Sequence, residues 1–230
     1  MFKNYFKIAF RSLWRNKSFS AINIFGLALG IASCLVILLF VSNELSYDRF
    51  NKNAGRIVRV IFRGSVQGEK MREAAVMPPT AQTLLADYPE VEQATRIRDF
   101  GSQRITYGDK TFSGDRFAFA DANIFQVFTL PLIAGDPKTA LLQPNTVVIT
   151  KALAQKYFGT TDAVGKELNI KSFNRTFKIT GVMKDIPANS HFQFGLFAAM
   201  EGLPEAKEPT WMTSNFHTYL LLPQGYDYKK

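Results

Sequence analysis

The chain has 230 residues, of which 47% are apolar and 20% are charged. This length suits one domain of about 150–200 residues with an appendage, or two small domains. The formal net charge is +9, but five basic residues precede the first acidic one, so the excess gathers at one end. A nucleic-acid-binding domain would instead carry a basic patch on its folded part. Cys34 is the only cysteine, which excludes an intramolecular disulfide and a zinc site built from cysteines.

The first 17 residues predict an amphipathic helix. Basic residues recur at every fourth position, and aromatic and aliphatic side chains fill most of the opposite arc. Such a helix lies in the headgroup layer, with its cations toward anionic lipid. We therefore predict residues 1–17 as a cytoplasmic interfacial helix with membrane lipids as partners. The residues predicted at this interface are Lys3, Lys7, Arg11, Trp14 and Arg15. The alternative, that these charges only set the orientation of the chain, stays open.

Residues 18–43 contain no charged side chain. As a helix these 26 residues would be about 39 Å long, against a hydrocarbon core of roughly 30 Å. A cleaved signal peptide would have a shorter apolar region that ends at a small-x-small cleavage site, and no such site follows Phe40. We therefore predict a transmembrane helix over residues 18–43 that stays attached to the protein.

The charges that flank this helix predict its orientation. Five basic residues precede it, and the first charges after it are those of Glu44 and Asp48. The positive-inside rule then places the N-terminus in the cytoplasm and residues 44–230 outside the cytoplasmic (inner) membrane.

Gly26 and Gly30 form a Gly-x-x-x-Gly pair within the predicted transmembrane helix. Glycine has no side chain, so a strip of glycines on one face of a helix allows another helix to approach closely. We therefore predict Gly26 and Gly30 as helix-packing residues that contact a partner span.

Residues 44–230 predict a mixed α/β domain, so the overall fold class is α+β with one membrane helix. The clearest unit is the apolar strand 146–149, followed by Thr150 as helix N-cap and by Gly159 as helix stop. The other predicted strands are 56–63, 70–77, 91–100, 104–107, 111–120, 166–170, 175–182, 192–197 and 216–222. Helical segments are predicted at 78–88, 121–128 and 151–158.

Residues suited to chemistry are scarce. No Gly-x-x-x-x-Gly-Lys loop is present, and the only histidines are His191 and His217. Asp185, Ser190 and His191 invite a hydrolase interpretation, but residues 185–190 predict a turn and no Gly-x-Ser-x-Gly elbow supports it. Glu201, Glu205 and Glu208 indicate a solvated loop rather than a cation site. We therefore predict no enzymatic activity, no cofactor and no metal.

Several short motifs follow one another along the chain. The first two groups are Asn16-Lys17-Ser18 with residues 23–33, and Glu44-Leu45-Ser46-Tyr47-Asp48-Arg49-Phe50 with residues 53–57. The next are residues 120–125 with Gly135-Asp136-Pro137, and residues 148–159. The last group is residues 164–166 with residues 177–182. This ordered set covers nearly the whole chain and resembles the first span and the external domain of MacB/FtsX-type ABC-transporter permeases.

The resemblance implies a transport subunit without catalysis of its own. Members of this family have four spans, a large external domain after the first span, and a cytoplasmic loop that contacts a separate ATPase. Two permeases and two ATPases assemble, and ATP-driven closure passes through the helices to the external domains. The implied partners are a cytoplasmic ABC ATPase, a second permease copy and, as a further candidate, a periplasmic adaptor. The substrate would be exported or extracted on the outer side of the membrane.

The chain departs from this family pattern because it has one span and no coupling loop. We therefore expect an N-terminal fragment of a longer permease, incomplete at the C-terminus of its external domain. The predicted strand 216–222 needs neighbours to bury its apolar side chains, and a helix capped by Asp227 would begin just before the chain stops. The ATPase contact would then belong to parts missing from this chain. A single-span membrane-anchored sensor or adaptor domain is the alternative.

Overall fold

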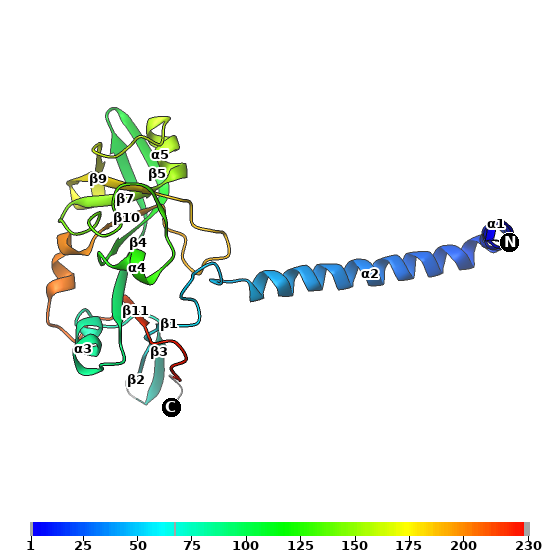
Figure 1. The fold of residues 1–230 in the computed structure, drawn as a ribbon, viewed down its shortest axis with the longest axis horizontal. Helices are drawn as coiled ribbons and strands as arrows, with labels where there is room; N and C mark the ends of the chain where they lie inside the picture. Colours follow the sequence, from blue (N-terminus) through cyan, green and yellow to red (C-terminus); the bar gives the residue numbers. More distant parts are fainter. Residues whose placement is uncertain (1, 67, 228–230) are drawn as a thin grey trace. The chain divides into compact units, whose positions relative to one another are not determined.

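The computed structural model describes residues 2–66 and 68–227, without the side chains of residues 2, 3 and 66. The chain divides into two units, Met1–Tyr47 and Asp48–Lys230 (Figure 1). The first unit is entirely helical, and the second holds all of the described strands.

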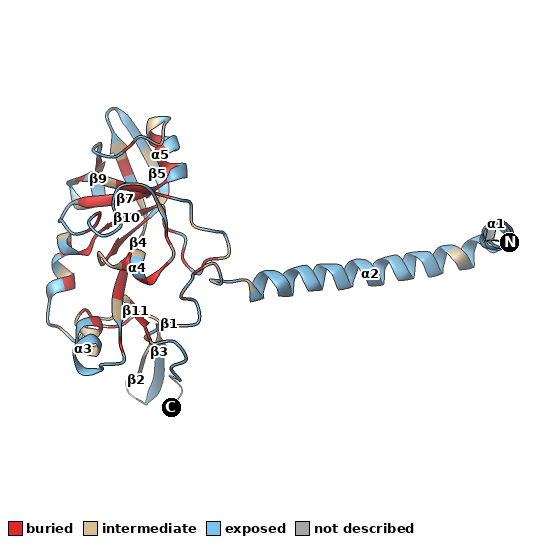
Figure 2. Cartoon of the chain, viewed as in Figure 1, coloured by how far each residue is buried: buried red, intermediate tan, exposed pale blue. Residues whose placement is uncertain are grey.

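The N-terminal unit consists of α1 (Phe2–Arg15) and α2 (Lys17–Leu45), which are separated by Asn16. Asn16 has a non-helical backbone, with φ −113° and ψ 55°. The 29 residues of α2 correspond to about 43 Å of helix. None of these residues is buried, and Figure 2 shows the helix exposed along its length. Within the described part of the chain, α2 is the one helix long and apolar enough to cross a membrane.

The second unit is a mixed α/β domain. Its strands are β1 (Ile57–Arg59), β2 (Phe62–Val66), β3 (Glu69–Glu73), β4 (Gln93–Tyr107), β5 (Lys110–Ala120), β6 (Leu132–Ala134), β7 (Thr146–Thr150), β8 (Glu167–Ile170), β9 (Arg175–Met183), β10 (Leu196–Ala199) and β11 (His217–Leu221). Its helices are α3 (Thr80–Asp87), α4 (Ile124–Val127) and α5 (Lys151–Phe158), with short 3₁₀ helices η1 (Lys171–Phe173), η2 (Met200–Gly202) and η3 (Pro204–Lys207).

Nine of these strands form one sheet in the order β1-β11-β4-β5-β10-β7-β9-β6, and β8 pairs with both β4 and β9. The double pairing of β8 closes β4, β5, β10, β7, β9 and β8 into a ring. Strands β2 and β3 form a separate hairpin. Since β10 runs parallel to β5 and β9 runs parallel to β7, the sheet is mixed.

Successive side chains of a strand point to opposite faces of the sheet. Each face of the central strands is covered by an apolar cluster, so these strands are buried on both faces. In β5, Phe117 and Phe119 enter one apolar cluster, while Ala118 and Ala120 enter another. Figure 2 shows this burial along the strands of the domain. The first cluster contains a group of aromatic rings in mutual contact, from Phe100, Phe117, Phe119, Phe173 and Phe177. The two clusters together fix the register of the sheet.

Arg96 of β4 is a buried arginine whose side chain donates four hydrogen bonds. Its Nε and Nη2 donate to the two carboxylate oxygens of Asp121, each at 3.0 Å. Its Nη1 donates to the carbonyl oxygens of Pro78 and Ala206, each at 2.9 Å. Arg96 thereby joins β4 to the start of α3, to η3 and to the turn before α4. Loss of such a buried partner typically costs about 3–5 kcal/mol of stability.

Predicted helices and turns are confirmed where the sequence has a clear capping residue or a glycine that ends the element. The Thr150 side chain accepts from the Leu153 backbone N–H at the start of α5, and Gly159 ends that helix with φ 70°. Gly135 shows why its motif needs glycine: φ is 91°, and an added Cβ would lie 2.3 Å from the Thr180 carbonyl oxygen. Strand β11 has the neighbours that the sequence predicted it to need, since it pairs with β1 and β4.

Several predicted strand boundaries are wrong. Residues 91–100 and 104–107 belong to one strand, β4, whose register shifts after Asp99 and after Gln103. Bulges at these points interrupt the alternation of side chains without ending the strand. The predicted strand 56–63 is instead divided between β1 and β2.

The predicted strand 192–197 also begins late, at Leu196. Phe192 and Phe194 precede it and are buried, and Phe192 makes an edge contact with Phe128. The alternation of Phe192 and Phe194 therefore comes from their packing into the core, and not from a strand at these positions. Strand β6 and the 3₁₀ helices are too short to give a periodic signal and were not predicted. The predicted helix after Asp227 falls on residues 228–230, outside the described part of the chain.

Candidate functional site

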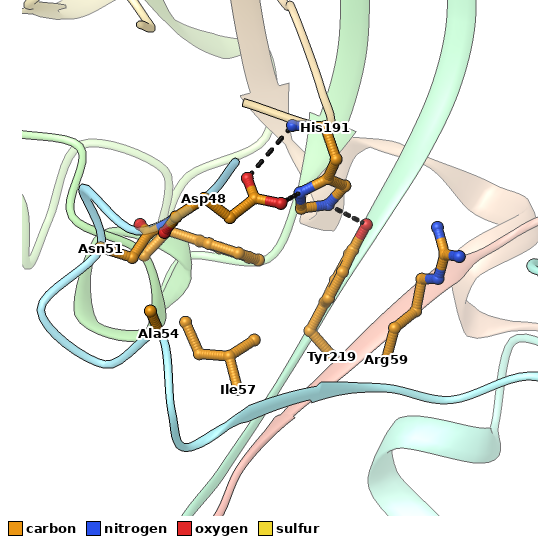
Figure 3. Close-up of a pocket in the computed structure, with 8 residues that line it drawn as sticks. Asp48, Asn51, Ala54, Ile57, Arg59, His191 and Tyr219 are labelled. Atoms are coloured by element: carbon orange, nitrogen blue, oxygen red, sulfur yellow. Dashed lines mark hydrogen bonds and ion pairs between the residues drawn. The ribbon is translucent and has the colours of Figure 1, made fainter. Parts of the chain in front are cut away.

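A cavity of about 310 Å³ lies at the point where the chain enters the second unit (Figure 3). It is lined by the entering segment, by the end of β1, by β11 and by the turns before β6 and β10. The lining residues are Asp48, Asn51, Ala54, Ile57, Arg59, Phe128, His191 and Tyr219.

Asp48 holds the entering segment to the turn that contains His191. Its backbone N–H donates to the Asn189 carbonyl oxygen at 2.8 Å. Its Oδ1 accepts from the His191 backbone N–H at 3.1 Å, and its Oδ2 lies 2.8 Å from the His191 Nδ1. Asp48 adopts the left-handed backbone conformation, with φ 59°, which L-residues other than glycine, asparagine and aspartate rarely adopt.

His191 continues this chain of contacts to the sheet. Its Nε2 lies 2.7 Å from the Tyr219 hydroxyl oxygen on β11 (Figure 3). With the Nδ1 hydrogen directed at Asp48, Nε2 accepts a hydrogen bond from the tyrosine hydroxyl. We refer to Asp48, His191 and Tyr219 as the clamp, because they join the entering segment, the turn before β10 and strand β11.

Asn51 fastens the same segment at a second place. The side chain is buried, its Oδ1 accepts from the Thr129 backbone N–H at 2.9 Å, and its Nδ2 donates to the Asp48 carbonyl oxygen at 3.1 Å. The Lys52 backbone N–H donates to Thr129 Oγ1 at 2.8 Å. The entering segment is therefore bonded both to the clamp and to the turn after α4.

The Tyr219 hydroxyl is protonated over a wide pH range. Burial raises the pKa of Tyr219 to about 12, although the positive charge of Arg59 beside it acts in the opposite direction. Only 4% of Tyr219 is exposed. The hydroxyl can therefore act as a hydrogen-bond donor in the clamp at any physiological pH.

A second cavity of about 100 Å³ shares Arg59, His191 and Tyr219 with the first. Its further lining residues are Ile97, Asp99, Arg116, Phe192, Phe194 and His217. Arg116 forms an ion pair with Asp99, and its guanidinium carbon lies 5.0 Å from the centre of the Phe194 ring.

The geometry does not assemble the hydrolase arrangement that Asp185, Ser190 and His191 suggested. Asp185 accepts from the Ala152 backbone N–H at 2.8 Å and so caps α5. The Ser190 hydroxyl lies 3.4 Å from Asp48 Oδ1, so its hydrogen bond is to the carboxylate. Within the described residues, no three His, Cys, Asp or Glu side chains gather as metal ligands do.

Two of the three glutamates in the loop after β10 form ion pairs. Glu205 pairs with Arg98, and Glu201 pairs with Lys207. These ion pairs involve side chains that are partly or largely exposed, so each contributes little stability.

The predicted interface residues of α1 lie on the N-terminal unit and not at the cavity. Trp14 is exposed, and the Lys17 ammonium lies 5.2 Å from the centre of its ring. Lys7, Arg11 and Arg15 are exposed, whereas the side chain of Lys3 lies outside the described part. Their role at the membrane stays a prediction.

The predicted packing residues Gly26 and Gly30 lie on α2. A Cβ atom added at either position would meet no atom of this chain within 4 Å. Larger side chains at Gly26 and Gly30 can therefore be accommodated within this chain. Packing against a partner helix stays a prediction.

The clamp was not predicted from the sequence. Asp48 and His191 are separated by 143 residues, and Tyr219 lies in an apolar strand where a core role is the default. The one available signal was that Asp48 belongs to a motif shared with the resembled family, while His191 is one of only two histidines.

The family model described as MacB-like periplasmic core domain matches residues 20–227, which include most of α2 and almost the whole second unit. The chain belongs to this family. The match thus begins within α2 and continues beyond β11. Comparison with curated proteins gives no match.

Solved structures agree with this assignment. A domain of a protein from Porphyromonas gingivalis that is described as a permease has 27% identity and a TM-score of 0.70, with 77% of each chain covered. The periplasmic region of MacB from Actinobacillus actinomycetemcomitans has 15% identity and a TM-score of 0.56, with 81% of each chain covered. The extracellular domain of the ABC-type transporter YknZ from Gram-positive bacteria has 14% identity and a TM-score of 0.53, with 74% of this chain and 84% of that chain covered. The last two show a shared fold.

The MacB-like core domain and the apolar helix α2 together indicate a membrane-anchored protein with a periplasmic domain. Two of these structures are a periplasmic region and an extracellular domain, and the third is a domain of a protein described as a permease.

Because the pKa of Tyr219 is raised in the folded protein, we expect the free energy of unfolding to fall at alkaline pH. The unfolded phenol ionises near pH 10, whereas the folded one does so near pH 12, so the stabilisation is complete below pH 10 and is lost as the pH rises toward 12. Two pKa units correspond to about 2.7 kcal/mol. Tyr219→Phe should lose about 1 kcal/mol at pH 8, from the missing hydrogen bond, but decline less steeply above pH 10.

Urea unfolding of the full chain in detergent between pH 8 and 11.5 measures both effects. Tyr88→Phe is the matched control, because Tyr88 is exposed. Burial and the hydrogen bond to Asp115 also raise the pKa of Tyr157. Tyr157 is present in every variant, so its contribution to the pH dependence of the free energy of unfolding is the same in each. Equal alkaline slopes for Tyr219→Phe and the unmodified chain would contradict the assignment.

Proposed function

We propose that the chain is part of the permease subunit of a MacB/FtsX-type ABC transporter. In this proposal a separate ATPase hydrolyses ATP, and the permease uses that energy to export or extract a substrate on the outer side of the cytoplasmic membrane. The observation that carries the proposal is the family match over residues 20–227, which covers most of the apolar helix and almost the whole second unit.

The clamp supports a mechanical role in efflux. Two residues, Ser46 and Tyr47, separate the end of α2 from Asp48. Asp48 is then bonded to His191, which contacts Tyr219 in the sheet. In this proposal a displacement of the helix would pass along the chain to Asp48 and through the clamp to the sheet, as mechanotransmission from the membrane to the outer domain requires.

The proposed layout keeps residues 1–17 as a cytoplasmic interfacial helix, 18–43 as the span and 44–230 as the extracytoplasmic domain. Lys3, Lys7, Arg11, Arg15 and Trp14 would contact membrane lipids. The proposed protein partners are an ABC ATPase, a second permease copy and a periplasmic adaptor.

The orientation is tested with reporter fusions. We expect an export-dependent reporter to be active when it is fused after Leu45 and after Lys230, because the five basic residues keep the N-terminus inside. A cytoplasm-dependent reporter at the same points serves as the control. Cytoplasmic activity at both fusion points would overturn the orientation and with it the transport proposal.

The ATPase partner is tested with the native gene product in its own membrane. After mild crosslinking, capture of a tagged copy should bring down an ABC-type ATPase, and deletion of the gene should lower ATP-dependent export while the ATPase is still made. A tagged single-span protein of similar span length is the control. Capture of a signalling protein instead, with export unchanged, would favour the sensor or adaptor alternative.

The glycine pair is tested by association in the membrane. Gly26→Ile together with Gly30→Ile should weaken contact between copies by about 1–2 kcal/mol, because branched side chains block close approach. Ala28→Ile together with Ala32→Ile is the matched control, since these residues have the same spacing on the opposite face of α2. A two-hybrid signal that both pairs reduce equally, or that neither pair reduces, would argue against a glycine interface.

A further inference from the structure

The hairpin formed by β2 and β3 has one face whose only charged side chains are cations. Side chains alternate between the two faces along a strand, and residues directly opposite in an antiparallel pair share a face. Arg63 is opposite Arg72, and Ser65 is opposite Lys70, so these four residues share one face. All four are exposed. We call Arg63, Lys70 and Arg72 the cationic face.

The glutamates of the hairpin do not neutralise the cationic face. Glu69 and Glu73 alternate with Lys70 and Arg72 along β3 and therefore lie on the other face. There, Glu73 accepts a hydrogen bond from the Ser214 hydroxyl. None of the three cations forms an ion pair with a carboxylate of the described residues.

Two of these like charges are direct neighbours across the hairpin. Opposite side chains of an antiparallel pair have Cβ atoms about 5 Å apart, and like charges at such positions are destabilising. Arg63 and Arg72 occupy such positions. A carboxylate over this pair would offset the repulsion and accept charge-assisted hydrogen bonds from the guanidinium groups. The cationic face therefore favours an anionic partner.

The backbone of the hairpin offers a second means of attachment. Among the described strands, β2 and β3 pair only with each other, so each has an unpaired outer edge. Each strand is five residues long, compared with three residues for β1 and β6 at the ends of the large sheet. Free edges accept extended segments of other chains, and a hairpin without further strands gains stability from a third strand.

The base of the hairpin is held in place. The Val60 backbone N–H donates to the Thr218 carbonyl oxygen at 2.9 Å, and the Val76 N–H donates to the Phe216 carbonyl oxygen at 2.8 Å. Both ends of the hairpin are therefore bonded to β11 or to the residue before it, beside the strands labelled β2 and β3 in Figure 1. A hairpin fixed at its base loses less conformational freedom on binding than a free loop does.

We propose that the hairpin binds an extended acidic segment of a partner protein, which adds a third strand at one of its edges. Backbone hydrogen bonds attach the segment, and carboxylates at alternate positions contact the cationic face, because every second side chain of the added strand lies on that face. An anionic lipid would use the charge but leave the edges unpaired. The interaction goes beyond the proposed transport function and needs no ATPase.

Binding of labelled peptides to the full chain in phosphatidylcholine nanodiscs tests the proposal by fluorescence anisotropy. One acetylated peptide alternates glutamate with threonine, four of each, and its isomer has the four glutamates followed by the four threonines. Both have the same charge, so the alternating peptide should bind about tenfold more tightly only if the spacing of its carboxylates matters. Soluble dihexanoyl phosphatidylglycerol is the lipid probe and should bind more weakly than the alternating peptide.

Paired variants separate the cationic face from the net charge. Arg63→Thr together with Arg72→Thr should remove the preference for the alternating peptide, and threonine suits a strand. Lys138→Thr together with Lys184→Thr is the matched control, because these exposed lysines lie outside the hairpin and the same charge is lost. Glu69→Gln, on the opposite face of β3, should not weaken binding.

Hydrogen exchange distinguishes strand addition from contact through side chains alone. The backbone amides of residues 62–66 and 69–73 should exchange severalfold more slowly when the alternating peptide is bound, because some of them become hydrogen-bonded to it. The threonine variants should keep the far-ultraviolet spectrum and the unfolding curve of the unmodified chain, since both arginines are exposed.

Equal binding of the two peptides, unchanged exchange in the hairpin, a preference that survives the arginine changes, or tighter binding of the lipid would each overturn the proposal. These outcomes leave the permease proposal untouched. Conversely, a failed ATPase capture leaves the peptide result standing.

Discussion

Strand β4 is the element on which the rest of the periplasmic domain depends. Its C-terminal half pairs with β8 and closes the ring of strands, while its N-terminal half pairs with β11, which carries Tyr219. Arg96, on the same strand, binds Asp121 and two carbonyl groups from other elements. One continuous strand therefore connects the packed ring, the α3 region and the clamp. A shift of β4 would disturb all three, because buried strands tolerate no change of register.

The parts of this fold that the sequence predicted are those with local signals. The N-cap Thr150 and the stop Gly159 define α5 within a few residues, and an uncharged run of 26 residues defines α2. Strand β4 was divided in the prediction because its bulges interrupt the local pattern while distant partners maintain the strand. The clamp was missed for a related reason. Its members come from three distant segments, and only the fold brings the two rings and the carboxylate together.

The domain uses its buried polar groups in two different ways. Arg96 and Asp121 bond to each other, and Arg96 also bonds to two carbonyl groups from other elements. The clamp borders a cavity of about 310 Å³. The first arrangement stabilises the fold. The second lies where the chain enters the domain and joins the entering segment to the sheet.

The ends of the large sheet have a consequence for crowding at the membrane. Within the described structure, β1 and β6 stand at the two ends of the strand order, and each is three residues long. Short terminal strands offer few free backbone groups to a strand of another molecule. Copies that crowd together on a membrane can therefore pair through these two ends over three residues at most.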